Sequence, residues 1–306
     1  MIYLPPNADI LPPVDDHIFK ILLTHPEAKP VLTSVLSAAM DRRVVDAVVR
    51  NNELPVGSNE EKAERFDVNC VLDDGDQADV EMHASHIEEP DGRHQNFNNK
   101  YIYYLTDLHA SQKSKGVKYY DLVRTYQITF CNYTIYPNWK DFITRASLRR
   151  ANGEEISDQI NFIIIELSKL TKALKKPPDQ LTALEMWSIF FRFAQDPKRR
   201  DMVNKVIAQK EEIAMASALL LEVSQDERER AQFRSRRMYE TDLQSNLLTA
   251  EARGITIGEA RGITIGEARG ITIGLYEVAR NMKKRGMSLT EIAALTNLPL
   301  KEVEKI

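Results

Sequence analysis

The sequence predicts a mixed α/β fold that continues into an all-helical C-terminal extension. In the first half of the chain, segments of alternating apolar and polar residues lie between segments whose apolar residues recur at helical spacing. From Thr182 onward the apolar residues recur almost only at helical spacing. A chain order of helix, three strands, helix and strand is typical of a mixed sheet with helices packed on it. We therefore expect such a sheet, with further helices behind it.

Composition limits the class of protein. The 306 residues carry 41 Lys and Arg against 45 Asp and Glu, a net charge of −4, and 43% are hydrophobic. These values are typical of a globular protein, and the negative charge argues against one that coats nucleic acid by bulk charge. Cys70 and Cys131 are too far apart in the sequence to form a paired zinc or redox motif.

Two further absences bear on location. The longest apolar stretch, residues 213–221, is far shorter than the ~18 residues that a membrane span needs. The N-terminal residues lack the basic and apolar segments of a signal peptide. We expect a cytoplasmic protein with no membrane partner.

Two helices are expected before the first strand. Asp15 and Asp16 suit the cap of a short helix over residues 17–23. Residues 31–40 place apolar side chains at helical spacing, which predicts a second helix. Residues 44–50 are rich in β-branched side chains and favour a strand.

A β-hairpin is expected next. Residues 65–72 and 78–84 both alternate apolar and polar side chains, as half-buried strands do. The Asp-Gly step at Asp74-Gly75 between them supplies the positive φ that a tight turn requires. Because side chains alternate between the two faces of a strand, Asp67 and Asn69 share one face of the first strand. Asp79, Glu81 and His83 share one face of the second, and the two faces can lie side by side.

The rest of the chain is mainly helical. Residues 94–112 carry an apolar stripe and predict a long helix, and residues 119–130 predict a strand. Residues 162–165 form a short apolar run that suits either a buried strand or the start of a helix. Residues 184–193 and 199–223 predict further helices.

Charge is concentrated around the hairpin. Between Glu60 and Asp91 twelve acidic residues face only two basic ones, Lys62 and Arg65. This suits either a solvated acidic hairpin or a site that holds hard divalent cations by carboxylate oxygens. An Asp on one strand beside Glu-x-His on the next favours the second interpretation, because two carboxylates can share a Mg²⁺ or Mn²⁺ ion that also binds a phosphate oxygen.

These residues resemble the PD-(D/E)xK nuclease superfamily, and more narrowly its branch of recombination-promoting nucleases and transposases. Five motifs carry the resemblance: Asp16 in DDHIFK, Asp67 in FDVNCVLDDG, Glu81 in DVEMHA, Tyr103-Tyr104 on the following helix, and GVKYYDL at residues 116–122. They cover residues 14 to 131 in the order that the family has. The resemblance implies a restriction-endonuclease-like mixed sheet flanked by helices.

The resemblance also implies a site. Asp67 and Glu81 would be the ligands of Mg²⁺ or Mn²⁺, and Asp16 would be a helix-borne acid near the same metal ion. Lys20 and Lys62 would contact the phosphates of DNA, the implied substrate.

Two positions depart from the family pattern. His83 stands where the superfamily has Lys and this branch has Gln, and Lys100 stands where the following helix usually has Arg. A neutral His binds metal or accepts a proton, so His83 belongs with the catalytic set of Asp67, Glu81 and Asp16. With an ordinary His pKa of ~6.5, cleavage would fall below about pH 6. Lys100 keeps the charge for a phosphate contact but loses the two-pronged geometry of Arg.

The C-terminal part divides by composition. We expect a nuclease-like core over residues 1–170, a helical region over 171–250, repeats over 251–274 and a small helical tail over 275–306. The repeats are three copies of EARGITIG, with Gly at every fourth position.

Two interpretations of the repeats stay open. On a helix, glycines at this spacing form a slowly turning stripe where a second helix can approach, and the flanking isoleucines would favour a homodimer or larger assembly. Alternatively, the repeats are a flexible spacer, since each Gly costs a helix ~1 kcal/mol relative to Ala.

The tail predicts three short helices. Ser288 and Glu291 form a capping-box pattern before one of them. The spacing resembles a DNA-binding helix-turn-helix, but the last helix, residues 300–306, has no evident set of base-contacting side chains. A small interaction module suits it at least as well.

Two functions are compatible with these observations. The first is a metal-dependent DNA endonuclease that hydrolyses phosphodiesters and is associated with recombination or transposon-like elements. The alternative is a catalytically inactive relative that binds DNA or itself through the C-terminal helices.

Overall fold

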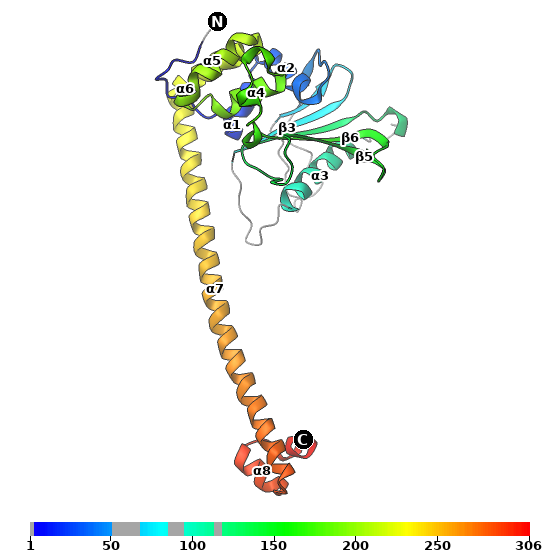
Figure 1. The fold of residues 1–306 in the computed structure, drawn as a ribbon, viewed down its shortest axis with the longest axis vertical. Coiled ribbons are helices and arrows are strands. Elements are labelled where there is room, and N and C mark those ends of the chain that lie inside the picture. Colours follow the sequence, from blue (N-terminus) through cyan, green and yellow to red (C-terminus); the bar gives the residue numbers. More distant parts are fainter. Residues whose placement is uncertain (1–2, 51–67, 85–94, 113–117) are drawn as a thin grey trace. The chain divides into compact units, whose positions relative to one another are not determined.

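The computed structural model describes residues 3–50, 68–84, 95–112 and 118–306. The chain forms two compact units, Met1–Arg230 and Ala231–Ile306. The first unit holds a mixed sheet with helices on both faces, and the prediction of a mixed α/β fold with a helical extension is confirmed (Figure 1).

The two N-terminal helices form where the sequence predicts them. Helix α1 (Asp16–Thr24) is capped by Asp15, whose Oδ1 accepts a hydrogen bond from the Ile18 amide at 3.2 Å. Helix α2 (Lys29–Met40) has a proline in its first turn, where no amide hydrogen is needed.

Within the described ranges, six strands form one sheet in the order β1-β2-β3-β4-β6-β5. Their bounds are β1 (Ala47–Val49), β2 (Val68–Leu72), β3 (Gln77–His83), β4 (Thr125–Cys131), β5 (Ile143–Arg149) and β6 (Glu155–Glu166). β3, β4 and β6 are parallel to one another, whereas β1, β2 and β5 are antiparallel to their neighbours. The predicted β2–β3 hairpin is present, and Gly75 in its turn has a φ of +90°.

One face of the sheet is apolar. Val80 of β3 and Phe130 of β4 are fully buried on it. Phe19 of α1 and Phe191 of α4 (Ala183–Phe193) pack on Phe130, with ring centroids 5.7 and 5.4 Å away. Figure 1 shows α1, α2 and α4 together on this side of the sheet.

Helix α3 (Gln95–Ala110) covers the opposite face, as Figure 1 shows. Its Tyr101 ring is fully buried and stacks on Phe162 of β6, with centroids 6.4 Å apart. This second face carries the polar residues of the next section.

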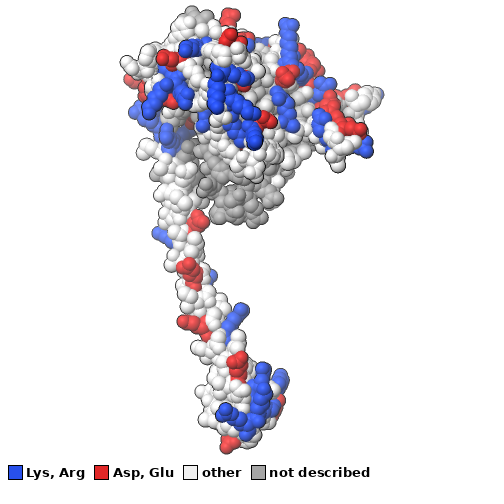
Figure 2. All heavy atoms as spheres, viewed as in Figure 1, with Lys and Arg blue, Asp and Glu red and all other residues white. Residues whose placement is uncertain are grey.

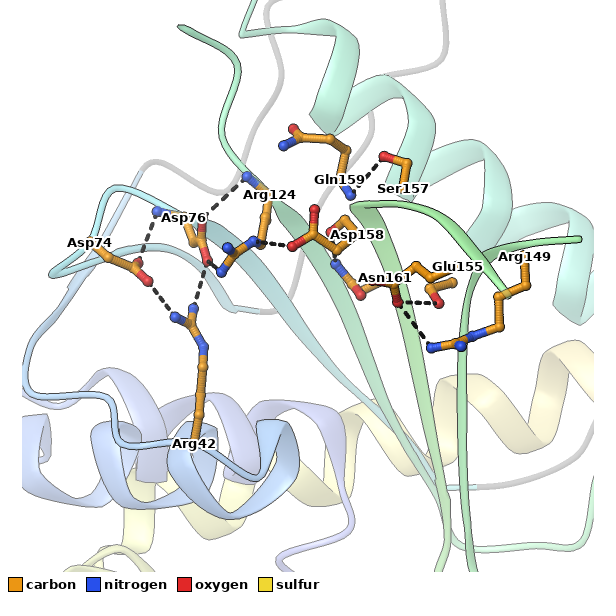
Figure 3. Close-up of polar contacts among 11 residues, drawn as sticks. Arg42, Asp74, Asp76, Arg124, Arg149, Glu155, Ser157, Asp158, Gln159 and Asn161 are labelled. Atoms are coloured by element: carbon orange, nitrogen blue, oxygen red, sulfur yellow. Dashed lines mark hydrogen bonds and ion pairs between the residues drawn. The ribbon is translucent and has the colours of Figure 1, made fainter. Parts of the chain in front are cut away.

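Ion pairs fix the end of the sheet that holds the β2–β3 turn. Arg42, just after α2, pairs with Asp74 and, at 2.7 Å, with Asp76. Arg124, just before β4, lies 3.7 Å from Asp76 and 2.7 Å from Asp158 of β6. Figure 3 shows this chain of contacts running from α2 across the hairpin turn to β6.

Several elements differ from the sequence-based expectations. The β5–β6 hairpin was not predicted, and residues 162–165, for which strand and helix were both open, belong to β6. The expected strand over 119–130 begins with a 3₁₀ turn at Tyr119–Asp121. The expected helix over 199–223 is two helices, α5 (Arg200–Gln209) and α6 (Glu211–Gln225), because Lys210 is extended. Other 3₁₀ turns are Leu167–Lys169, Ala173–Lys175, Pro178–Gln180 and Pro197–Arg199.

The second unit is helical. Helix α7 (Glu227–Lys284) begins before it and carries the repeats, and α8 (Leu289–Thr296) and α9 (Leu300–Lys305) follow. Ala279, Ile292 and Val303 form a small core between the three helices. The predicted capping box of Ser288 and Glu291 is present.

The repeats of α7 expose their isoleucines by 53–66% within this chain. Because eight residues turn an α-helix by about 80° beyond two full turns, these side chains point around the helix and form no single stripe. None of the helices in the described part of the chain is long and apolar enough to cross a membrane.

Candidate active site

A row of polar side chains crosses the middle of the α3-covered face. Asp79 and Glu81 of β3 lie beside Gln127 and Thr129 of β4 in parallel register, and Asn69 of β2 lies opposite Asp79. All five residues are buried. Burying a carboxylate is costly unless it is hydrogen-bonded, paired or bound to a metal ion, so this row needs a physical explanation.

Hydrogen bonds satisfy only part of the row. Gln127 Nε2 donates to Asp79 Oδ2 at 2.8 Å, which holds that carboxylate in place. Gln127 Oε1 and Thr129 Oγ1 are buried and have no hydrogen-bond partner among the residues that the structure describes. A buried oxygen without a partner costs about 1–3 kcal/mol, which points to a ligand or water on this face.

His83 ends β3 on the same face as Glu81 and is largely buried. Its ring meets Tyr101 of α3 edge to face, with centroids 5.2 Å apart. Burial, and secondarily the charge of Lys100, lower the pKa of His83 to about 4. His83 is therefore neutral near pH 7, and the sequence-based premise of an ordinary pKa is wrong. An acid limit near pH 6 is no longer expected from His83.

Lys100 lies close to this group. Its Nζ is 5.0 Å from the ring centroid of Tyr101 and 5.2 Å from that of Tyr104, at cation–π distance. The structure thus brings Glu81, His83 and Lys100 to one region, with Tyr101 between the histidine and the lysine.

Asp16 and Lys20 lie on α1. Asp16 is exposed, and its Oδ1 accepts a hydrogen bond from the His17 amide at 2.8 Å. Lys20 is half-buried, and its carbonyl accepts a hydrogen bond from Thr24. No hydrogen bond or ion pair joins Asp16 or Lys20 to β3 in the described part of the chain, so their place at the site stays a prediction.

Asp67 and Lys62 lie outside the described residues. Asp67 directly precedes Val68 in the sequence, and Val68 pairs across the hairpin with Val80, the neighbour of Glu81. Within the described ranges no three His, Cys, Asp or Glu side chains form a group that would hold a metal ion.

The comparison with family models decides the family. A model described as "PD-(D/E)XK nuclease family transposase" matches residues 13–250. This chain belongs to that family. No curated protein and no solved structure matches it. Membership in the PD-(D/E)XK family supports a nuclease, and so a hydrolase, with DNA as its substrate class.

PD-(D/E)XK nucleases typically use divalent metal ions, and the donor atoms here fit such ions. Glu81 and Asp79 offer carboxylate oxygens, and Gln127 Oε1 and Thr129 Oγ1 offer neutral oxygens on the same face. Oxygen donors suit Mg²⁺ and Mn²⁺, whereas softer metals favour thiolate. Burial raises the pKa of the nearby Cys131 thiol well above its ordinary value, so that sulfur is not a thiolate.

Sequence reasoning placed Asp79 on this face but gave it no role, and it did not single out Gln127 or Thr129. A local signal exists, because Thr125, Gln127 and Thr129 are polar at every second position of a strand whose other face is apolar. Their position beside β3 depends on the parallel pairing of strands far apart in the sequence.

Proposed function

We propose that this PD-(D/E)XK family chain is a metal-dependent endonuclease that hydrolyses DNA phosphodiesters during recombination or the movement of transposon-like elements. The observation that carries the proposal is the buried row around Glu81. Two of its oxygens have no hydrogen-bond partner among the residues that the structure describes, and a neutral His83 lies at its end. A sheet built only for stability would have apolar side chains there.

In this proposal Asp67 and Glu81 hold one or two Mg²⁺ or Mn²⁺ ions, assisted by Asp16. The bound ion supplies charge to polarise the scissile phosphate and lowers the pKa of an attacking water. Asp79, held by the Gln127 amide, adds negative charge behind Glu81.

His83 and the lysines have separate roles in the proposal. Neutral His83 accepts a hydrogen bond from the attacking water and orients it, as a carbonyl oxygen of Gln would at this position. Lys20, Lys62 and Lys100 balance the phosphate charge, and Lys100 is the lysine whose nearness to His83 supports this role most directly.

The test is nicking of supercoiled plasmid by the purified chain in Mg²⁺ and in EDTA. Asp67→Ala and Glu81→Ala should each lower nicking by at least about a hundredfold, because each removes charge that the metal ion needs. Glu154→Ala is the matched control, since it removes an exposed acid of the β5–β6 turn whose one ion pair among the described residues is with Arg150. If Glu81→Ala nicks at the wild-type rate, the cleavage does not depend on this site and the assignment fails. If the wild-type chain does not nick in Mg²⁺, the inactive relative is favoured.

We also propose that the C-terminal part drives self-association. Exposed isoleucines on α7 and six glycines with open space around them support this, because a partner helix can approach at those positions. Deletion of residues 251–274 should lower the number of chains per particle, which is the sedimentation mass divided by the mass of one chain. If the number of chains per particle is unchanged, the repeats are a spacer.

A further inference from the structure

The loop after β4, residues 132–142, lies at the end of the sheet that carries His83. His83 pairs with Cys131 at the ends of the parallel strands β3 and β4, and the Asn132 amide donates to the His83 carbonyl at 2.9 Å. Tyr133 and Tyr136 of this loop pack on a buried cluster with Phe162, the residue that stacks on Tyr101. Side-chain packing thus runs from His83 through Tyr101 and Phe162 to this cluster and the loop.

The loop is held in one conformation by a buried charge. Glu166 at the end of β6 accepts hydrogen bonds from the amides of Ile135 and Tyr136 at 2.7 and 3.0 Å. Lys169 Nζ bridges Glu166 and the Tyr136 carbonyl, at 2.6 Å from each. A surface fixed in this way binds a ligand without a large cost of ordering.

Trp139 is displayed on this fixed loop. Its ring stacks on Tyr136 with centroids 4.0 Å apart and planes inclined by 25°. Trp139 is 49% exposed, whereas Trp187, the other tryptophan of the chain, is fully buried. The stack with Tyr136 fixes the plane of the indole while half of the side chain stays open to solvent.

Two lysines lie on or beside this loop. Lys140 follows Trp139 and is exposed, and Lys172 lies 3.6 Å from Asp141 with 77% of its side chain exposed. Figure 2 shows Lys and Arg side chains, interspersed with Asp and Glu, on the face of the first unit that it displays. Flat aromatic surfaces for bases, with cations for the backbone, are the combination that recognises single-stranded nucleic acid.

We infer that Tyr136 and Trp139 form a stacking platform for the bases of an unpaired DNA strand entering the active site. The inference rests on the proposed nuclease function and adds the class of DNA: strands that are single or locally unpaired. In a duplex the faces of the bases are already stacked on one another, so the platform discriminates against fully paired DNA.

Binding of labelled DNA to the full chain tests this without cleavage. Fluorescence anisotropy in EDTA would compare an oligothymidine of about 12 nucleotides, within the usual site size, with a duplex of the same length. Trp139→Leu should weaken binding of the single strand by about 5- to 150-fold, the range for one stacked base, and change duplex binding less than about twofold. Trp139→Phe, which keeps a flat ring, should recover most of the affinity.

Two further measurements guard against misfolding and non-specific effects. Tyr120→Leu removes another exposed aromatic, beside Lys118 and before the amino end of β4, and should leave both affinities unchanged. The single strand should quench the emission of Trp139, and the remaining emission of Trp139→Phe, which comes from buried Trp187, should not respond.

Failure of the inference differs from failure of the proposed function. Equal affinity of wild type and Trp139→Leu for the single strand overturns the platform, as does an equal loss for single strand and duplex or no DNA binding at all. If Glu81→Ala nicks normally while Trp139→Leu loses the single strand, the platform stands and the catalytic proposal fails.

Discussion

Replacing Glu166 by Gln tests the buried charge that orders the aromatic loop. Glu166 is fully buried and binds two backbone amides and the Lys169 ammonium group. Gln keeps the shape and one acceptor oxygen. However, it directs an amide NH₂ group towards Lys169, so two donors face each other and the lysine loses its counter-charge.

The expected loss follows from the burial of both groups. Removing one partner of a buried ion pair costs about 3–5 kcal/mol, because the other charge remains in a low-dielectric site. The Lys169 side chain keeps 10% exposure, so water relieves part of the penalty. We expect the free energy of unfolding of the first unit to fall by about 3 kcal/mol.

Urea unfolding followed by the emission of Trp187 measures this loss, in a Trp139→Phe background so that only the buried indole reports. Glu154→Gln, which breaks the exposed pair with Arg150, should cost less than about 0.5 kcal/mol. Lys169→Met combined with Glu166→Gln should cost less than the sum of the two single changes, because it removes the orphaned charge. A loss below about 1 kcal/mol for Glu166→Gln, or strict additivity, would refute the reasoning.

Two further predictions concern the cysteines and the hairpin turn. Burial, and secondarily Asp79, raise the pKa of Cys70 to about 12, and burial raises the pKa of Cys131 well above its ordinary value. Both thiols should therefore stay protonated at pH 8 and resist iodoacetamide until the chain is denatured. Mass spectrometry of the alkylated chain measures this. Gly75→Ala should cost about 1–2 kcal/mol in urea unfolding because its φ is +90°, whereas Gly254→Ala in α7 should carry no such cost.

Local signals in the sequence predicted the hairpin and the strand face that Glu81 and His83 share. The Asp-Gly step gave the turn, and the period of two placed Glu81 and His83 on one face, because both depend only on neighbours along the chain. The cap of α1 by Asp15 is local in the same way. Such features are present in the sequence before any tertiary contact forms.

Features that depend on distant contacts were missed. Gln127 and Thr129 lie beside Glu81 only because β4 pairs with β3 in parallel, a pairing that spans α3. The lowered pKa of His83 depends on its burial under α3. The alternation in β5 is weak because much of that strand is exposed at the edge of the sheet, so its hairpin with β6 carries little periodic signal.

The buried polar row is expected to lower stability while serving the active site, and a change at Thr129 tests both effects. Thr129 Oγ1 is buried, faces the same side as Glu81 and has no hydrogen-bond partner among the described residues. Thr129→Val keeps the shape and removes the unsatisfied hydroxyl, so the free energy of unfolding in EDTA should rise by about 1 kcal/mol. Functional sites often carry such a cost in stability, and plasmid nicking in Mg²⁺ should fall in the same variant.

Ile128→Val, which removes a methyl group from the apolar face of the same strand, is the control. It should instead lower the free energy of unfolding by about 1 kcal/mol and leave nicking unchanged. A Thr129→Val chain that loses stability while nicking at the wild-type rate would mean that the hydroxyl serves the fold rather than the site.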